Sequence, residues 1–599
     1  MKRLIVGILA SIGGMVLFSV IGIFVIAKMN QGQHKEIQAR SVLYLQFSGR
    51  IAENTDASGL NSLFSLPAHS LYNIVHAIDM ASKDPRVIGI VARLDQASLG
   101  LAQTQEIRNA IMRFRVSGRD QEKFTIAHAD TFGEMSPGTI PYYLASAFEE
   151  IWIQPMGAIC MTGLYAEMPF AKQALDSIGV QSRIGKREEY KSALDMYTES
   201  AMTKASKEST QALLNSLMNQ IVRDVALSRE LNEPDVWDSI HKGPLFGSDP
   251  LKLGMVDRVD YFDEVTPYIR DKIKNEFSFV NYQDYLAANP LPAVKAGTQK
   301  IAIIFGNGAI MRSQPMNVPF NNDSMNPAHI KKAFEDAVAD EDVAAIVFRV
   351  NSPGGSPVAS ETILRALRKA KQSGKPVIIS MSDVAASGGY WISAYADSIV
   401  AHPSTITGSI GVLGGKWVTK EAWEKLGIHW DQVQIGDNAS MWSNIVDYTP
   451  QGWERLQSSL DNIYQNFIER VAEGRKLPQE HVQEIAKGRV WSGEDALKFG
   501  LVDKLGDLHE AIAVAKDMTS LSDQTVPLQI FPRPLSVTEQ LEKFILGHTD
   551  ENEIEVSQND LSSSLGAIGS LLNLIYTQVR GIFHPHDETI MSPIKDIKG

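Results

Sequence analysis

Ser387 is placed between two stretches of different hydrophobic pattern, in the sequence Ser382–Trp391. The apolar, β-branched run Pro376–Ser380 predicts a buried strand before it. Behind it, apolar residues at helical spacing predict a helix: Tyr390, Ile392, Tyr395 and Ile399. A helix N-terminus presents unpaired N–H groups and partial positive charge, so a serine there could attack a carbonyl carbon while N–H groups hold the oxyanion. The alternative is that Ser387 is a helix N-cap.

A second glycine-containing turn could supply further oxyanion donors. Asn351–Ser356 follows the apolar run Ala345–Val350, which predicts a strand. A Pro-Gly-Gly turn leaving a strand can expose successive backbone N–H groups, which suits an oxyanion site. The candidates are the N–H groups of Gly354 or Gly355, together with that of Gly388. The alternative is a tight turn with no chemical role.

The attacking serine would need a base, for which the sequence offers two candidates. His402 is close in sequence, but Pro403 follows it beyond the predicted helix, so we interpret it as structural. A lysine whose pKa is lowered by burial can act instead, and Ser–Lys pairs are known variants of the catalytic triad. Lys191, within Gly185–Ala193, is that lysine; the alternative is a solvated surface residue.

Ser409 is a rival nucleophile, because Gly408–Gly411 superficially resembles an esterase elbow. Such an elbow needs a strand before it and a helix after it. Pro403 and Thr405 precede Ser409, and Val412–Gly415 follows, so the segment is predicted to be a loop.

A long internal repeat determines how these residues must be positioned. Corresponding pairs of segments run through the chain: Val42–Leu45 and Ile301–Ile304, Val87–Asp95 and Val343–Asn351, Tyr142–Ala145 and Tyr390–Ser393, Ser177–Val180 and Lys425–Ile428, Lys252–Asp257 and Lys498–Asp503. In this alignment Ser387 corresponds to Thr139, and Lys191 to Trp442. The second copy has the serine without the lysine, and the first has the lysine without the serine. The sequence therefore predicts one site shared by the two copies.

Each copy alternates short buried strands with longer amphipathic helices, which predicts an α/β fold with largely parallel strands. The predicted domains are the first copy at residues 41–288, the second at 299–530 and a C-terminal extension at 531–599. The stretch 289–297 has the composition of a linker. Long helices are predicted at Met202–Arg229 and Gly452–Gly474.

Composition excludes several classes of function. The 599 residues carry a net charge of −13 without a compensating basic face, which argues against nucleic-acid binding. The single cysteine, Cys160, cannot form an internal disulfide, and no Cys/His cluster has the spacing of metal ligands. His584 and His586 are interpreted as part of a solvated tail. We therefore expect no metal and no cofactor.

The N-terminal residues 1–35 are predicted to be a membrane anchor. Leu4–Ala27 contains no charge, and as a helix it would reach about 36 Å, enough for a bilayer core of about 30 Å. Lys2 and Arg3 precede it, which favours an N-terminus inside and a body outside. A cleaved signal peptide is the alternative.

The anchor, both repeats and four motifs closely resemble the long, tandem-repeat form of the signal peptide peptidase A (protease IV) family. The motifs are Asn351–Gly355, Ala385–Tyr390, Thr407–Gly411 and Tyr190–Ala193. The resemblance covers residues 1 to about 530. Lys186–Glu189 looks like an insertion relative to the family, which makes the match of Lys191 weaker than that of Ser387.

The resemblance implies two domains like the Clp protease subunit and the crotonases, with a Ser–Lys dyad split between the repeats. It also implies a homotetramer on the periplasmic side of the bacterial inner membrane that degrades released signal peptides and other unfolded apolar peptides. Two other functions stay open: a crotonase-like acyl-CoA enzyme, which needs neither anchor nor nucleophile, and an inactive membrane-bound scaffold.

Overall fold

The computed structural model describes residues 36–54, 69–118, 123–290, 294–312 and 324–533. The predicted anchor Leu4–Ala27 lies outside these ranges, as does most of the predicted C-terminal extension. Among the described helices, none combines the length and the apolar character needed to cross a bilayer.

The first repeat is built on a parallel sheet with the strand order β2-β1-β3-β4-β5-β7, in which β8 also pairs with β1. Its apolar strands are buried on both faces, as expected for a parallel sheet. The strands are β1 (Ser41–Ala52), β2 (His69–Ser70), β3 (Val87–Ser98), β4 (Phe124–Ala129), β5 (Glu150–Ile153), β7 (Arg258–Val259) and β8 (Ser278–Asn281).

The second repeat is built on a sheet with the order β17-β15-β13-β12-β9-β19, in which β14 pairs with both β13 and β18. Its pairs are parallel except that of β15 with β17. The strands are β9 (Lys300–Asn307), β12 (Val343–Ser352), β13 (Val377–Ala386), β14 (Ser398–Ala401), β15 (Ile406–Gly408), β17 (Val490–Ser492), β18 (Lys504–Leu505) and β19 (Leu528–Phe531). A separate small pair joins β10 (Ala309–Ile310) and β11 (Ser324–Met325).

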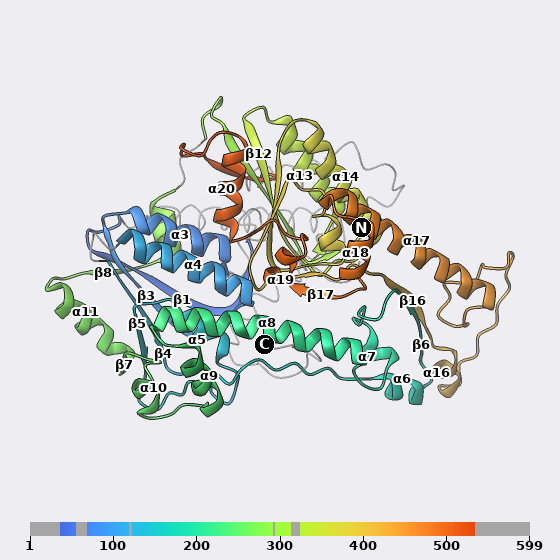
Figure 1. The fold of residues 1–599 in the computed structure, drawn as a ribbon, viewed down its shortest axis with the longest axis horizontal. Coiled ribbons are helices and arrows are strands. Elements are labelled where there is room, and N and C mark those ends of the chain that lie inside the picture. Colours follow the sequence, from blue (N-terminus) through green and yellow to red (C-terminus); the bar gives the residue numbers. More distant parts are fainter. Residues whose placement is uncertain (1–35, 55–68, 119–122, 291–293, 313–323, 534–599) are drawn as a thin grey trace, which may run out of the picture. The chain divides into compact units, whose positions relative to one another are not determined.

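The two sheets confirm the predicted tandem α/β repeat. The order β1-β3-β4-β5-β7 in the first sheet matches β9-β12-β13-β14-β18 in the second, and Figure 1 shows the two sheets with their own helices. The first repeat carries α3 (Leu71–Lys83), α4 (Leu101–Gly118), α5 (Thr139–Ala145), α6 (Lys172–Ile178), α7 (Asp195–Thr198), α8 (Lys204–Arg229), α9 (Glu233–Lys242), α10 (Asp249–Lys252), η2 (Phe262–Glu264), α11 (Val265–Ile273) and α12 (Tyr282–Ala288). The second carries α13 (Pro327–Ala339), α14 (Pro357–Gln372), α15 (Gly388–Trp391), α16 (Lys420–Lys425), α17 (Pro450–Arg475), α18 (Gln479–Ile485), α19 (Gly493–Lys498) and α20 (Leu508–Met518).

The long helices α8 and α17 fall where the sequence predicts them, and they begin in the same way. Thr203 caps α8 by accepting from the N–H of Ser206, and Thr449 caps α17 by accepting from the N–H of Gly452. A cap of this kind satisfies one of the N–H groups that the first helical turn leaves unpaired. Equivalent signals in the two copies therefore set equivalent helix starts.

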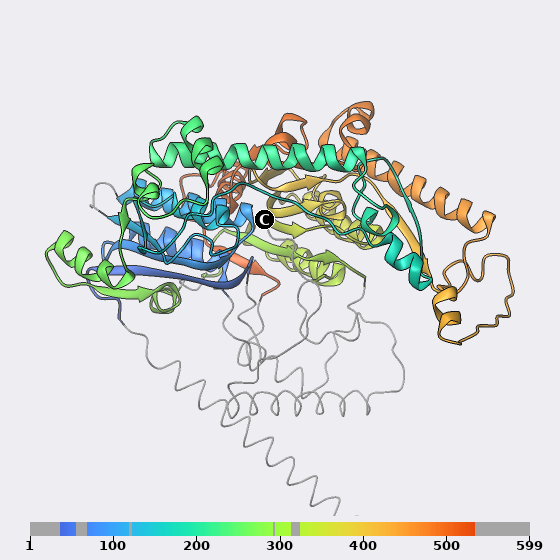
Figure 2. The ribbon, with the colours of Figure 1, turned by 90° about the horizontal axis from the view of Figure 1, so that it is seen from below.

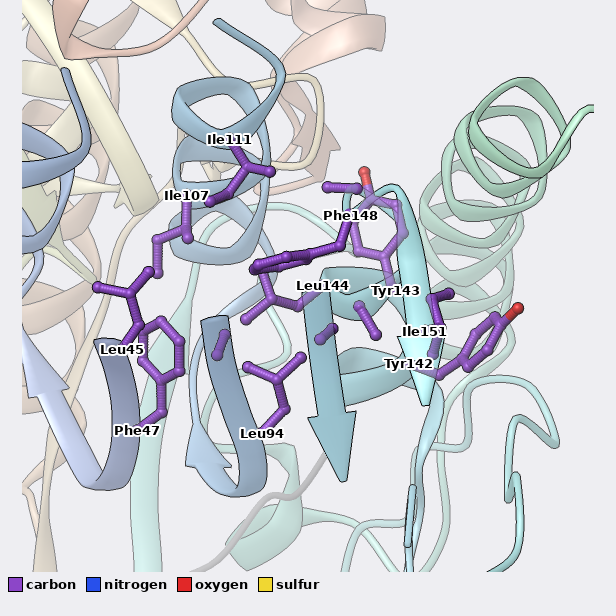
Figure 3. Packing of buried hydrophobic residues seen from close by; sticks show 14 of the residues in the cluster. Leu45, Phe47, Leu94, Ile107, Ile111, Tyr142, Tyr143, Leu144, Phe148 and Ile151 are labelled. Atoms are coloured by element: carbon purple, nitrogen blue, oxygen red, sulfur yellow. The ribbon is translucent and has the colours of Figure 1, made fainter. Parts of the chain in front are cut away.

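Apolar side chains of the helices close over each sheet. Figure 3 shows Ile107 and Ile111 of α4 above Leu45 and Leu94 of the first sheet, all fully or almost fully buried. Burying an aliphatic side chain of this size contributes about 1.5–3 kcal/mol. This packing fixes α4, whose N-terminal turn contacts the second repeat.

Two structural features connect the repeats. Strand β6 (Gln181–Lys186) of the first repeat pairs antiparallel with β16 (Leu413–Val418) of the second, and Figure 1 shows them side by side. Helix α8 reaches the second repeat, as Figures 1 and 2 show, and there Ser216 Oγ lies 2.8 Å from Ser492 Oγ of β17. The segment after β6 is thereby held against the second repeat.

Candidate active site

Ser387 lies directly after β13, as the sequence predicts, but the helix behind it is shorter than predicted. Helix α15 covers only Gly388–Trp391, and Ile399 belongs to strand β14. The prediction of a longer helix was wrong. Tyr390 and Ile392 are buried at the short helix and just after it, whereas Ile399 is buried in a strand, and together these positions have the spacing of one apolar helix face.

The backbone at Ser387 has φ +53° and ψ −120°, values that a residue with a side chain rarely adopts. Its N–H donates to the carbonyl oxygen of Gly408 at 2.9 Å, which holds the turn. Such strain costs about 1–3 kcal/mol and persists where the surroundings enforce it. The turn presents the half-buried serine hydroxyl at the C-terminal end of a central strand.

Lys191 reaches the serine from the first repeat. Behind β6, the N–H of Tyr190 donates to the carbonyl oxygen of Lys487, and Gly488 leaves room for the lysine, since a Cβ at Gly488 would lie 2.6 Å from Lys191 Cβ. The Lys191 side chain is 5% exposed, and its Nζ lies 3.1 Å from Ser387 Oγ. The structure therefore brings the two predicted residues together within one chain.

Burial lowers the pKa of Lys191 to about 8. Removing an ammonium group from water disfavours its charged form. No acidic side chain in the described ranges forms an ion pair with Lys191, so nothing of that kind offsets the loss of hydration. The neutral form of Lys191, which can accept a proton, is therefore a minority near pH 7 and predominates above about pH 8.

Ser409 also contacts the lysine, which the sequence did not reveal. Lys191 Nζ donates to the Ser409 carbonyl oxygen at 2.8 Å and lies 2.9 Å from Ser409 Oγ. The prediction that no strand precedes Ser409 was wrong, because β15 ends at Gly408. No described helix follows directly, since the next element is β16, and this part of the prediction is confirmed.

The predicted glycines surround the serine. A Cβ on Gly354 would lie 2.5 Å from the Gly388 nitrogen, and one on Gly388 would lie 3.1 Å from the Gly355 nitrogen, so side chains would not fit here. The N–H of Gly354 donates to Ser352 Oγ at 3.2 Å. In the part of the chain that the structure describes, the N–H groups of Gly355 and Gly388 have no acceptor. These two are the available donors.

His402 belongs to a buried polar cluster between the repeats. Its Nε2 lies 3.1 Å from Glu106 Oε2 of α4. Arg349 of β12 donates to Glu53 Oε2 at 2.9 Å and also binds Glu106, and all three side chains are buried. Burial opposes ionisation of Glu106, but Arg349 and His402 lower its pKa to about 2. This arrangement supports the structural interpretation of His402.

Asp383, four residues before the serine, caps α4 across the same boundary. Its Oδ1 accepts from the N–H groups of Ala102 and Gln103 at 2.9 and 3.2 Å. Burial and the nearby Glu53 raise the pKa of Asp383 to about 6. The strand that carries Ser387 is thus tied directly to the first repeat.

Comparison of the sequence with known families identifies the class of protein to which the chain belongs. Residues 129–274 and 369–522 match peptidase family S49, one region in each repeat. The chain belongs to this family, and it is a serine protease.

Among its relatives, "Protease 4" of Salmonella typhi is 33% identical over 532 residues, which cover 84% of this chain and 82% of that protein. "Protease 4" of Haemophilus influenzae is 29% identical, over 82% of this chain and 81% of that protein. "Serine protease SPPA, chloroplastic" of Arabidopsis thaliana is also 29% identical, over 84% of this chain and 72% of that protein.

Proposed function

We propose that this chain is a serine endopeptidase in which Ser387 is the nucleophile and Lys191 its general base. The distance of 3.1 Å between Lys191 Nζ and Ser387 Oγ carries the proposal, because direct proton transfer requires hydrogen-bond contact. The lowered pKa of Lys191 supports the assignment, since the base must be neutral to act.

Ser409 would orient the base. A neutral amine has two N–H donors and one lone pair. If the two donors bind the carbonyl oxygen and hydroxyl of Ser409, the lone pair remains for the O–H of Ser387. Ser409 is therefore a positioning residue in this proposal.

The reaction would proceed through an acyl-enzyme. Lys191 takes the proton from Ser387, whose oxygen attacks the peptide carbonyl carbon. The N–H groups of Gly388 and of Gly355 or Gly354 hold the oxyanion; Gly355 is favoured because its N–H is unpaired. The Lys191 ammonium then gives its proton to the leaving amine, and water activated by the same lysine releases the acyl group.

We further propose that the substrates are released signal peptides and other unfolded apolar peptides. This proposal follows the resemblance to the signal peptide peptidase A family, as does the assignment of each repeat to the Clp protease and crotonase type of domain. The uncharged segment Leu4–Ala27 would anchor a homotetramer in the bacterial inner membrane, by a single pass with the body in the periplasm.

Covalent labelling separates this function from the two alternatives. A fluorophosphonate should modify Ser387, located by peptide mass spectrometry, and should block cleavage of an apolar fluorogenic peptide. A crotonase-like enzyme would process acyl-CoA thioesters without being labelled, and an inactive scaffold would do neither. Absence of labelling at Ser387 with peptide cleavage intact would contradict the proposal.

The pH dependence of cleavage should follow Lys191. Its neutral form increases as the pH rises through the lowered pKa of about 8, so kcat/KM should rise from pH 6 to a plateau above pH 9. His402→Gln, which introduces the residue found at the corresponding position Gln154, should keep the same midpoint. Loss of the midpoint in His402→Gln would instead indicate a Ser–His mechanism.

A further inference from the structure

Arg489 lies between the segments that carry the two members of the Ser–Lys pair. It ends the loop of residues 486–489, which joins α18 to β17 in the second repeat. Its guanidinium carbon lies 5.0 Å from the ring centroid of Tyr190, the residue before Lys191, and 4.4 Å from that of Trp491. Both distances are within the range of about 6 Å for cation–π contacts. The arginine of the second repeat is thus stacked against the segment of the first repeat that supplies the lysine.

The same loop also contacts that segment through its backbone and through an ion pair. The carbonyl oxygen of Lys487 accepts from the N–H of Tyr190 at 3.1 Å. Glu208 of α8 accepts from the Tyr190 hydroxyl at 3.3 Å and from Arg489 Nη1 at 3.1 Å. The backbone contact places the main chain before Lys191, whereas the Tyr190 ring is placed by Arg489 and Glu208.

On its other side, Arg489 is connected to the turn of the serine. The carbonyl oxygen of Arg489 accepts from the N–H of Ser409 at 2.7 Å. The ring of Trp491 packs so closely on Gly408 that a Cβ there would lie 3.0 Å from Trp491 Cδ1. The carbonyl oxygen of Gly408 in turn accepts from the N–H of Ser387 at 2.9 Å. One stack of side chains therefore runs from the residue before the lysine to the residue that holds the serine.

The internal repeat shows that the fold does not itself require this arginine. In the first repeat, Pro244 is at the position of Arg489, directly after a Lys-Gly pair that occurs in both copies. In the second repeat, Met441 is at the position of Tyr190, by the alignment that pairs the lysine with a tryptophan. The arginine accompanies the serine, and the tyrosine accompanies the lysine.

We propose that Arg489 is a positioning residue for the Ser–Lys pair, because its stacking between Tyr190 and Trp491 keeps the segment of Lys191 closed against the serine. The arginine touches no reacting atom and acts through Tyr190. The inference rests on the proposed function, in which Lys191 is the base, and adds the residue that keeps this base buried.

Burial of Lys191 is the property that Arg489 would protect, since burial is what lowers the pKa of this lysine. Several ionisable side chains lie on the neighbouring segments: Glu188, Glu189 and Tyr190 before the lysine, Lys487 and Arg489 in the loop, Glu208 of α8 and Tyr464 of α17. Within the described ranges, none of these side chains hydrogen-bonds to Lys191 Nζ. Release of the Tyr190 ring would let water reach Nζ and raise the pKa of Lys191 toward its usual value, which leaves less neutral base at pH 7.

The pH profile of fluorophosphonate labelling at Ser387, measured on the full-length protein, tests the proposal. Arg489→Met should move the midpoint up by about one pH unit and lower the rate constant at pH 7 by about tenfold. The loss should be smaller at pH 9.5, where more of the lysine is neutral. A purely structural role would reduce the amount of protein that can be labelled without moving the midpoint, and this result would overturn the proposal.

Substitutions of Tyr190 test the route by which the arginine acts. Tyr190→Leu removes the ring and should shift the midpoint as Arg489→Met does, and the double variant should shift it no further. Tyr190→Phe keeps the ring and should keep the wild-type midpoint. A wild-type midpoint in Tyr190→Leu, or shifts that add in the double variant, would show that Arg489 does not act through Tyr190 and would overturn the proposal.

Arg183 of β6 is the matched control, because it also reaches from one repeat to an aromatic ring of the other. Its guanidinium carbon lies 5.0 Å from the Trp453 ring centroid, and its Nε donates to Asp447 Oδ1 at 2.7 Å. Arg183→Met removes a similar stack away from Lys191, so the labelling midpoint should not move. An equal shift in Arg183→Met would mean that the effect is not specific to Arg489.

Two further results separate this proposal from its alternatives. If Arg489→Met raised KM for an apolar peptide and left the labelling midpoint in place, the arginine would bind substrate, and the positioning role would be wrong. The proposed function fails if the wild type is not labelled at Ser387 or if Lys191→Met keeps the midpoint. The positioning role fails by itself if Lys191→Met removes the midpoint and Arg489→Met leaves it unchanged.

Discussion

Replacing Ser387 with alanine is expected to lower kcat for peptide cleavage by at least about 10⁴-fold, because the nucleophile is lost. Lys191→Met should lower kcat by about 10²–10⁴-fold, since it removes the base while keeping an apolar stem in the buried site. The double variant should be no slower than Ser387→Ala, because groups that act as a unit give losses that do not add. Steady-state kinetics at pH 8 measure all three.

Ser409→Ala is the matched comparison on the other hydroxyl near Lys191. It removes one partner of Nζ but leaves the Ser409 carbonyl oxygen in place. A single hydrogen bond is worth about 1 kcal/mol, so kcat should fall by about tenfold or less. Abolished activity in Ser409→Ala with activity retained in Ser387→Ala would reverse the assignment of the nucleophile.

Arg349→Met should lower the free energy of unfolding by about 3–5 kcal/mol, because it leaves the buried carboxylates Glu53 and Glu106 without their cation. The deficit should shrink as the pH falls toward 5, where the stranded carboxylates can take up protons. Urea denaturation at pH 7.5 and pH 5 measures both effects.

The control for this variant is Arg368→Met on α14. Arg368 is about one-third exposed and lies 3.9 Å from Glu473, so its loss should cost about 0–1 kcal/mol. Equal losses of unfolding free energy in the two variants would contradict the stabilising role assigned to the buried cluster. They would also contradict the inference that each repeat depends on the other for its stability.

The internal repeat made most of this site predictable. Ser387 and Lys191 were each ambiguous alone. The first repeat has Thr139 in place of the serine and the second has Trp442 in place of the lysine, and this pattern indicated one shared site. The parallel sheets followed from short apolar runs, because strands buried on both faces lack the alternation of half-exposed ones.

The remaining features depend on contacts between residues far apart in the chain. Nothing local distinguishes Glu53 or Glu106 from solvated acids, and only the fold brings them to Arg349. Ser409 was considered as a nucleophile, but its contact with Lys191 depends on the pairing of β6 with β16 across the repeats. The length of the helix after Ser387 was overestimated. The apolar residues that were predicted to lie on one long helix are instead buried by a single helical turn and the strand that follows it.

The rate at which a fluorophosphonate modifies Ser387 as a function of pH tests the central claim, that a lysine of the first repeat activates a serine of the second. In the wild type, the second-order rate constant should rise with a midpoint near pH 8. In Lys191→Met it should fall by about 10²-fold or more and lose that midpoint. An unchanged rate and midpoint in Lys191→Met would show that another group activates Ser387 and would contradict the shared dyad.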